Sequence, residues 1–279
     1  MVRRYLSFVV GLAFFAALFA MPAQAGQSLV FGVHPFKSTS ELAKMFRPLI
    51  DYLEKETGSS ISFRTAKNYD AALNALLAGD MHISFMGPSL FAIASGQHAD
   101  KIHLLGTASK DGNPTFKGVI IAKEGSSINS LADLKGKKFA FGDRESTLSC
   151  YVPAHMLMQA GIFESLEYKF LGSHDNVAKA VQLGMFDAGG IKPAVAAKYT
   201  GQGLKIIAES EPVYEHVLVA SSSVDDETLK KLRLAVLNLK DPAVLGAIKK
   251  GLSGFMEVDA DKYNSLRQLM NDVDAKIPH

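Results

Sequence analysis

Three hydroxyl side chains lie close together where a predicted strand gives way to a predicted helix. Ser146, Thr147 and Ser149 follow an apolar run that ends at Phe141 and open a helical pattern that continues to Gln159. A helix N-terminus has unpaired N–H groups and a partial positive charge, which favour an anion, and nearby hydroxyls add further donors. The segment therefore fits a small oxyanion. The alternative is an ordinary cap, because Ser and Thr are frequent N-caps that bind only their own helix.

Cys150 and His174 raise a second chemistry, that of a Cys/His nucleophile. A thiolate near a helix start would be stabilised, but the sequence marks no third residue that would orient the imidazole. The spacing of four other histidines does not match that of metal ligands; they are His82, His98, His103 and His155. We therefore predict a protein that is not an enzyme and that has no catalytic residues, metal or cofactor.

The elements that would position these residues alternate regularly. Apolar runs predict strands, and periodic apolar positions between them predict helices. The main predicted strands are 29–33, 61–63, 83–86, 119–122, 138–141 and 168–171, and the main predicted helices are 69–77, 149–159 and 175–183. Strands spaced by helices predict an α/β fold with largely parallel sheets. From residue 225 onward the pattern predicts helices only.

The first helix has the clearest local signals. Ser38 and Glu41 form a capping-box pattern at its start, and Gly58 marks its end. Pro48 lies inside the pattern and predicts a kink or a local break.

Two apolar, extended segments, 118–123 and 216–220, could be crossings between two lobes. About 95 residues separate them, the size of a small α/β lobe. On this interpretation residues 26–118 begin the first lobe, residues 119–216 form the second, and residues 217–279 return to the first and add C-terminal helices. Periodicity alone allows equally that both segments are core strands of a single domain.

The N-terminus predicts export to the periplasm. Residues 1–25 combine Arg3 and Arg4, an uncharged apolar run and the cleavage pattern Ala23-Gln24-Ala25, as in a cleaved signal peptide. The alternative, a membrane anchor, is disfavoured because the run is short and is followed by Pro22. Without this segment the chain has 28 basic and 28 acidic residues. Such a balance provides no general attraction for nucleic acid.

The hydroxyl segment resembles a family signature. Ser146-Thr147-Leu148-Ser149, followed by Pro153, resembles the Ser-Thr-x-Ser motif of phosphonate/phosphate ABC-transporter substrate-binding proteins. Other stretches agree with that family in order and spacing up to about Ala220, among them Phe85-Met86-Gly87-Pro88-Ser89, Gly172-Ser173-His174-Asp175 and Gly184-Met185-Phe186-Asp187-Ala188-Gly189.

The resemblance implies a two-lobe periplasmic-binding-protein fold, type II-like, with two crossing strands as its hinge. It implies that Ser146, Thr147, Ser149 and His174 contact the phosphoryl-type oxygens and that Tyr69 reaches in from the other lobe. From the sequence alone His174 could instead cap the next helix, and Tyr69 could be a core aromatic residue. The implied protein is a monomer that passes a small oxyanion to the membrane permease of an ABC importer. A periplasmic sensor of the same fold that docks on a membrane receptor or sensor kinase is the alternative.

One departure from the family bears on the ligand. Members that take an aminoalkylphosphonate need carboxylates for its ammonium group, and the resemblance places one about 20 residues after His174 and another near the second crossing. The first neighbourhood has no acid and contains Lys192, and the second has Glu215 beside the aligned position. We therefore expect phosphate, phosphite, a simple alkylphosphonate or another tetrahedral oxyanion. In the alternative, Glu209, Glu211 or Glu215 holds an ammonium group.

Overall fold

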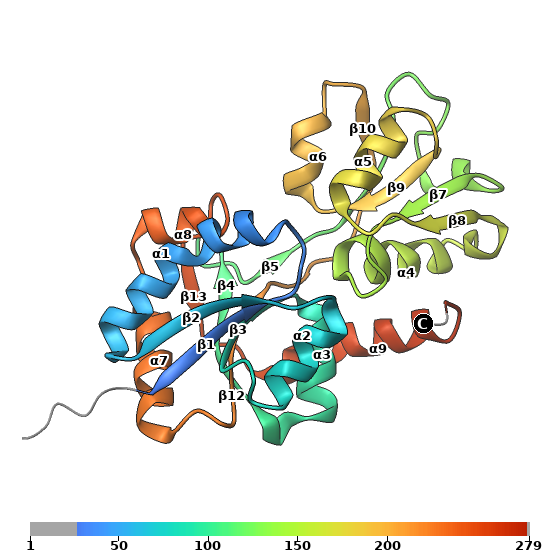
Figure 1. The fold of residues 1–279 in the computed structure, drawn as a ribbon. Coiled ribbons are helices and arrows are strands. Elements are labelled where there is room, and N and C mark those ends of the chain that lie inside the picture. The colour runs from blue at the N-terminus through green and yellow to red at the C-terminus, as the bar shows by residue number, and fades with distance from the viewer. Residues whose placement is uncertain (1–26, 278–279) are drawn as a thin grey trace, which may run out of the picture.

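The computed structural model describes residues 27–277, and most of their strands form two sheets in separate lobes (Figure 1). The predicted signal peptide falls outside the described residues. The first sheet has the order β13-β4-β12-β3-β1-β2, with β1 (Ser28–Val33), β2 (Ser60–Thr65), β3 (Ile83–Met86), β4 (Ile102–Ser109), β12 (Val217–Ser221) and β13 (Gly254–Met256). The second has the order β10-β6-β9-β7-β8, with β6 (Val119–Lys123), β7 (Lys138–Phe141), β8 (Glu167–Phe170), β9 (Ala188–Ile191) and β10 (Leu204–Glu209).

Helices surround both sheets. The helices of the first lobe are α1 (Thr39–Thr57), α2 (Tyr69–Leu77), α3 (Pro88–Gln97), α7 (Asp226–Asn238), α8 (Pro242–Ile248) and α9 (Asn264–Asp274). Those of the second lobe are α4 (Val152–Gln159), α5 (His174–Gln182) and α6 (Pro193–Tyr199). The α/β, two-lobe prediction is confirmed. No helix within residues 27–277 is both long and apolar enough to cross a membrane.

The sheets are mixed, so the prediction of largely parallel sheets is wrong. β1 is parallel to β2 and β3, and β7 is parallel to β8 and β9. In contrast, β12 is antiparallel to β3 and β4, and β6 is antiparallel to β9 and β10. Parallel neighbours need a crossover within one sheet. The chain instead reaches β6 and β12 from the other lobe. The need for a crossover within one sheet therefore does not apply to these two strands.

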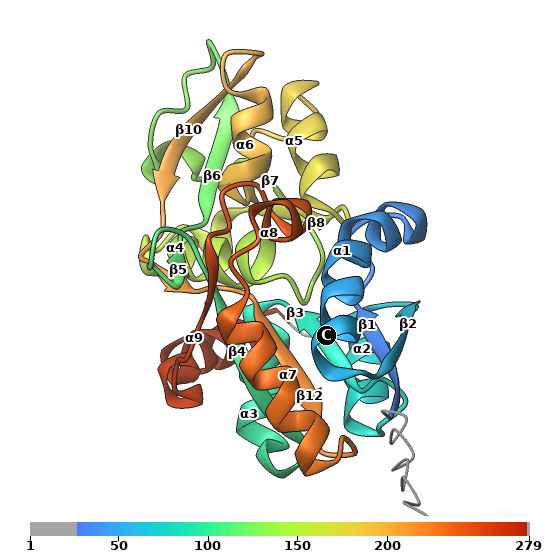
Figure 2. The ribbon, with the colours of Figure 1, turned by 90° about the vertical axis from the view of Figure 1, so that its left-hand side faces the viewer.

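The chain passes between the lobes just before the segments that the sequence indicated. The segments 118–123 and 216–220 are largely β6 and β12, which are interior strands of their own sheets. The connections lie on their N-terminal sides and contain β5 (Thr115–Phe116) and β11 (Val213–Tyr214), which pair with each other antiparallel. Figure 2 shows β6 and β10 rising into the second lobe beyond β5. The predicted positions of the crossings are therefore shifted.

The sequence signals that predicted the two ends of α1 are confirmed. Its capping box between Ser38 and Glu41 is present, and Gly58 ends it with a left-handed φ of 72°. The helix is continuous through Pro48, so the local break does not occur, and the alternative, a kink, stays a prediction. Phe46 and Leu49 lie on either side of Pro48 and are fully buried. Their packing supports the helix across the missing hydrogen bond.

The C-terminal part differs from its prediction in two ways. β13 adds a three-residue edge strand to β4 in a region where only helices were predicted. In addition, α9 contacts both α3 and α4 and so spans the two lobes (Figure 1). Arg144 of the second lobe forms an ion pair with Asp274 of α9 at 2.6 Å. This helix therefore lies against the second lobe as well as the first.

Candidate ligand-binding cleft

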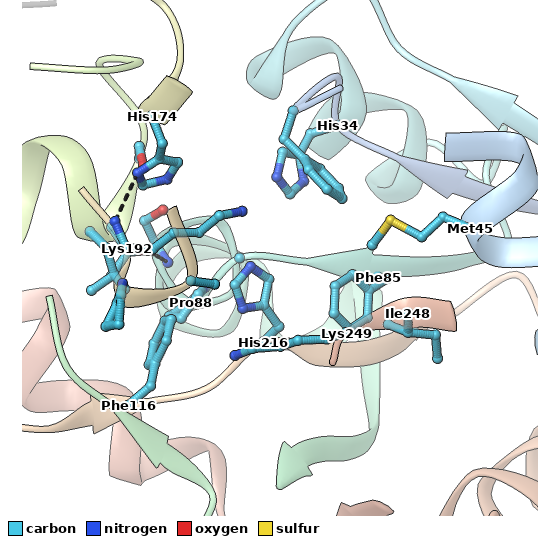
Figure 3. A pocket seen from close by; sticks show the side chains of 18 of the residues that line it. His34, Met45, Phe85, Pro88, Phe116, His174, Lys192, His216, Ile248 and Lys249 are labelled. Atoms are coloured by element: carbon cyan, nitrogen blue, oxygen red, sulfur yellow. Dashed lines mark hydrogen bonds between the residues drawn. The ribbon is translucent and has the colours of Figure 1, made fainter. Parts of the chain in front are cut away.

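A cavity of about 400 Å³ lies between the lobes. His34 and Phe85 line it from the first lobe, and His174 and Lys192 line it from the second (Figure 3). Ser146 of the second lobe also lines it. A neighbouring cavity of about 280 Å³ also has Ser146, His174 and Lys192 in its wall. The two cavities are therefore parts of one cleft.

The five predicted site residues converge on this cleft. Tyr69, Ser146, Thr147 and His174 line the larger cavity, and Ser149 lines the smaller one. Tyr69 is the first residue of α2 in the first lobe, and the other four come from the second lobe. Their role in ligand binding stays a prediction.

The hydroxyl segment forms a π-helical turn, Thr147–Tyr151, before α4 begins. Ser146 caps this turn because its Oγ accepts a hydrogen bond from the Ser149 N–H at 3.3 Å. Ser149 Oγ is buried, and no partner for it exists within residues 27–277. A cap that accepts through its lone pair keeps its own O–H free to donate. Ser146 and Ser149 can therefore both donate hydrogen bonds to an anion.

Thr147 joins the two lobes. The backbone N–H of Ser89, in the first turn of α3, donates to Thr147 Oγ1 at 2.9 Å. Ser89 Oγ donates to the Glu145 carbonyl oxygen at 2.6 Å. Like Ser146, Thr147 accepts a backbone N–H and keeps its hydroxyl hydrogen. These contacts bring the N-terminus of α3 close to the hydroxyl segment.

His174 presents a defined donor to the cleft. Its Nδ1 accepts a hydrogen bond from the Lys192 backbone N–H at 3.1 Å. Burial lowers the pKa of His174 well below its usual value, and the charges of Lys192 and His216 add to that effect. A neutral ring whose Nδ1 accepts must carry its proton on Nε2. The Nε2–H is then a neutral donor.

His216 differs from His174 in that its Nε2 is an acceptor rather than a donor. Its Nδ1 lies 3.0 Å from Glu215 Oε2, and Glu215 also forms an ion pair with Lys249. Burial would raise the pKa of Glu215, but hydrogen bonds and charges from His216 and Lys249 outweigh it and hold that pKa at about 2. An ionised Glu215 makes Nδ1 the donor, so a neutral His216 ring has Nε2 as an acceptor. Burial lowers the pKa of His216 despite this carboxylate.

The sequence did not single out His34, His216 or Lys249 as site residues. His34 follows β1 at its carboxyl end, the place where ligands bind in open α/β sheets, and this was the available signal. Its ring packs on Tyr69 with centroids 4.3 Å apart, and its buried Nδ1 has no partner in the described chain. Burial lowers the pKa of His34 to about 3, with help from His216 and Lys192. No feature of the neighbouring sequence indicated that Lys249, which follows α8, belongs to the site.

The larger cavity has a basic wall. Its lining includes three histidines and four lysines, and none of its lining residues in the described part of the chain is Asp or Glu. Asp143 and Asp175 enter only the wall of the smaller cavity. An anion would find donors and positive charge there without like-charge repulsion.

Cys150 does not fit the nucleophile hypothesis. It is fully buried, and burial raises the pKa of its thiol to about 12. A thiol held protonated at neutral pH is a poor nucleophile. Within residues 27–277, no group of three or more His, Cys, Asp or Glu side chains could hold a metal ion.

Comparisons with known proteins agree on a family. The family model of the ABC transporter, phosphonate, periplasmic substrate-binding protein matches residues 31–263. The phosphate-import protein PhnD of Mycolicibacterium smegmatis is 29% identical over 234 residues, which cover 74% of this chain and 70% of that protein.

Solved structures show the same fold. PhnD1 from Prochlorococcus marinus in complex with methylphosphonate superposes with a TM-score of 0.79 at 22% identity, over 88% of this chain and 98% of that one. A binding protein component of a phosphonate ABC transporter from Pseudomonas aeruginosa superposes with a TM-score of 0.72 at 22% identity, over 88% and 86% of the chains.

Proposed function

The chain belongs to the family of periplasmic substrate-binding proteins of phosphonate ABC transporters, and from this premise we propose that it captures a small tetrahedral oxyanion without an amino group. The ligand is phosphate, phosphite or a phosphonate that lacks an amine. The protein binds its ligand for transport rather than catalysing a reaction, and it delivers the ligand as a monomer to a membrane permease.

The observation that most directly supports this proposal is the set of hydrogen-bond donors at the hydroxyl segment. Ser146 and Thr147 each accept a backbone N–H and so have a hydroxyl hydrogen left to donate. Ser149 Oγ is buried without a partner in the described chain, and His174 presents Nε2–H. A buried polar atom costs free energy unless it is hydrogen-bonded. An oxyanion would satisfy these groups together.

The pairing of the acids near the larger cavity supports a ligand without an amine. Glu215, the acid beside the family's carboxylate position, is already paired with Lys249 and His216. Glu209 lies 3.6 Å from Lys117, and Glu211 lines a separate cavity beside α9. In the larger cavity a ligand ammonium group would therefore meet Lys192 with no carboxylate in the described lining to pair with, at a large desolvation cost. The phosphate and methylphosphonate named for the relatives contain no amine.

We further propose that binding closes the cleft. The moving parts are a first lobe of residues 26–118 and 217–279 and a second lobe of residues 119–216. The two connections containing β5 and β11 act as the hinge, because they cross between the sheets and, within residues 27–277, their strands pair only with each other. Hinge closure around a ligand is a common transition in two-lobe proteins.

Competition between matched ligands tests the proposal. In calorimetric titrations, ethylphosphonate should bind at least as tightly as 2-aminoethylphosphonate, and phosphate or phosphite should compete with it. If the amine form bound tenfold tighter, which is about 1.4 kcal/mol, the assignment of a ligand without an amine would be wrong. If none of these anions bound, the proposed function itself would fail.

A further inference from the structure

Two lysines face the cleft from opposite lobes. Lys192 precedes α6 in the second lobe, and Lys249 follows α8 in the first. The Lys192 Nζ lies 5.7 Å from the ring centroid of Phe36, a residue of the first lobe. The Lys249 Nζ lies 5.0 Å from the ring centroid of Phe116. Both ammonium groups therefore lie against aromatic walls of the same cavity.

The charge of Lys192 is poorly compensated. Burial lowers the pKa of Lys192, and the positive charge of Lys249 is the next cause. Asp175 acts in the other direction, but it already pairs with Lys198 at 3.3 Å. Lys192 forms no ion pair with any carboxylate that the structure describes. An ammonium group in this position gains from an anionic partner that the protein does not supply.

The positive charge of Lys249 is only partly compensated. Its partner Glu215 also accepts hydrogen bonds from the backbone N–H and the ring of His216. With His216 neutral, the two lysines and Glu215 leave one positive charge at this end of the cavity. The hydroxyl end, in contrast, provides neutral donors.

The cavity is larger than an inorganic anion requires. Its volume of about 400 Å³ lies in the range of pockets that enclose organic molecules. Phe36, Phe85 and Phe116 provide apolar wall beside the lysines. Such a wall suits a short carbon chain, and the lysines suit a charged group at the end of that chain.

We infer that the ligand is a phosphonate with a second acidic group, a carboxylate on a short carbon chain, and that this carboxylate pairs with both Lys192 and Lys249 across the cleft. This inference rests on the proposed function, since the tetrahedral head occupies the hydroxyl segment. The carboxylate would replace the repulsion between the two lysines with attraction to both. Binding of the second group would thus favour closure of the lobes.

The test uses matched pairs of ligands that differ in the carboxylate. Calorimetric titrations compare phosphonoacetate with ethylphosphonate and 3-phosphonopropionate with propylphosphonate, at pH 7.5 and moderate salt. In at least one pair the carboxylated ligand should bind at least tenfold tighter. Lys192→Met should reduce that ratio to threefold or less, whereas Lys179→Met, at an exposed lysine of α5 outside the cleft, should preserve it.

Three results would overturn the inference. The first is equal binding within both pairs, which leaves the proposed function standing. The second is a preference that survives in Lys192→Met at full size, because the carboxylate would then be held elsewhere. The third is failure of all four ligands to bind, together with phosphate and phosphite, which would remove the proposed function as well.

Discussion

The backbone N–H of Lys192 donates a hydrogen bond to His174 Nδ1 at 3.1 Å, and this contact sets which ring nitrogen is left to bind a ligand in the cleft. His174 begins α5, whereas Lys192 follows β9, so the two meet only because α5 packs on β9. The bond fixes the neutral tautomer with Nε2–H as donor. His174 can therefore bind an oxyanion without carrying a charge.

Replacement of His174 should weaken anion binding. His174→Phe removes the Nε2–H donor, and a hydrogen bond to a charged group is worth about 1.5–3 kcal/mol, or at least a tenfold loss of affinity. His174→Gln keeps an N–H donor and should lose less. Calorimetric titration with methylphosphonate compares them. Equal affinities for His174→Phe and the wild type would contradict the donor role.

Loss of two hydroxyls should weaken binding more strongly. Ser146→Ala combined with Thr147→Val removes two donors to the anion, and at about 1.5–3 kcal/mol each the affinity should fall a hundredfold or more. Ser95→Ala is the matched control, because its Oγ donates only to the Phe91 carbonyl inside α3. The fold should persist by circular dichroism. Unchanged binding by the double variant would show that the site is misassigned.

Gly142 should not tolerate a side chain. An added Cβ would lie 2.0 Å from Ser149 Oγ, so Ser149 would have to move. Gly142→Ala should therefore reduce both anion affinity and the free energy of unfolding, by roughly 1–3 kcal/mol for an overpacked core site. Gly246→Ala is the control for the unfolding measurement alone, since its added Cβ would enter open space, whereas its place in the wall of the smaller cavity makes it unsuitable as a control for affinity. Titration calorimetry and urea unfolding report the two effects, and a Gly142→Ala protein with normal affinity would contradict this packing.

Ligand should make the protein more compact. If the lobes close about the connections that contain β5 and β11, saturating methylphosphonate should lower the radius of gyration measured by small-angle X-ray scattering. The Ser146→Ala/Thr147→Val variant at the same ligand concentration should show a smaller change. An unchanged radius in the wild type, under conditions where calorimetry shows saturation, would rule out closure.

Acid should destabilise the ligand-free protein partly through His34. Burial lowers its pKa from 6.5 to about 3, with help from His216 and Lys192, while Tyr69 packs on its ring. Below pH 6.5 the unfolded state takes up a proton that the folded state does not bind until about pH 3. The stability is thus complete above pH 6.5 and is lost as the pH falls, at about 1.4 kcal/mol per pH unit for this one group.

His34→Phe should make the loss of stability shallower. Urea unfolding between pH 6 and pH 4.5 gives the free energy of unfolding of both proteins, and the difference between their slopes isolates this residue. Identical slopes would mean that His34 is not held neutral by burial.

Local sequence determined the parts of this protein that depend on neighbours in the chain. Ser38, Glu41 and Gly58 set the ends of α1, and the predicted bounds 69–77 and 83–86 match α2 and β3, because caps and apolar periodicity act over a few residues. The hydroxyl segment was visible for the same reason. Its three hydroxyl side chains lie within residues 146–149.

The tertiary structure decided what depends on distant segments. The mixed sheets, the edge strand β13 and the true connections between the lobes follow from pairings that no short window contains. His34 and Lys249 lie more than 200 residues apart, and only the meeting of β1 and α8 at one cleft gives them a common role. The neutral tautomer of His174 and the unpaired charge of Lys192 likewise arise from burial and from contacts across the fold, which sequence spacing does not encode.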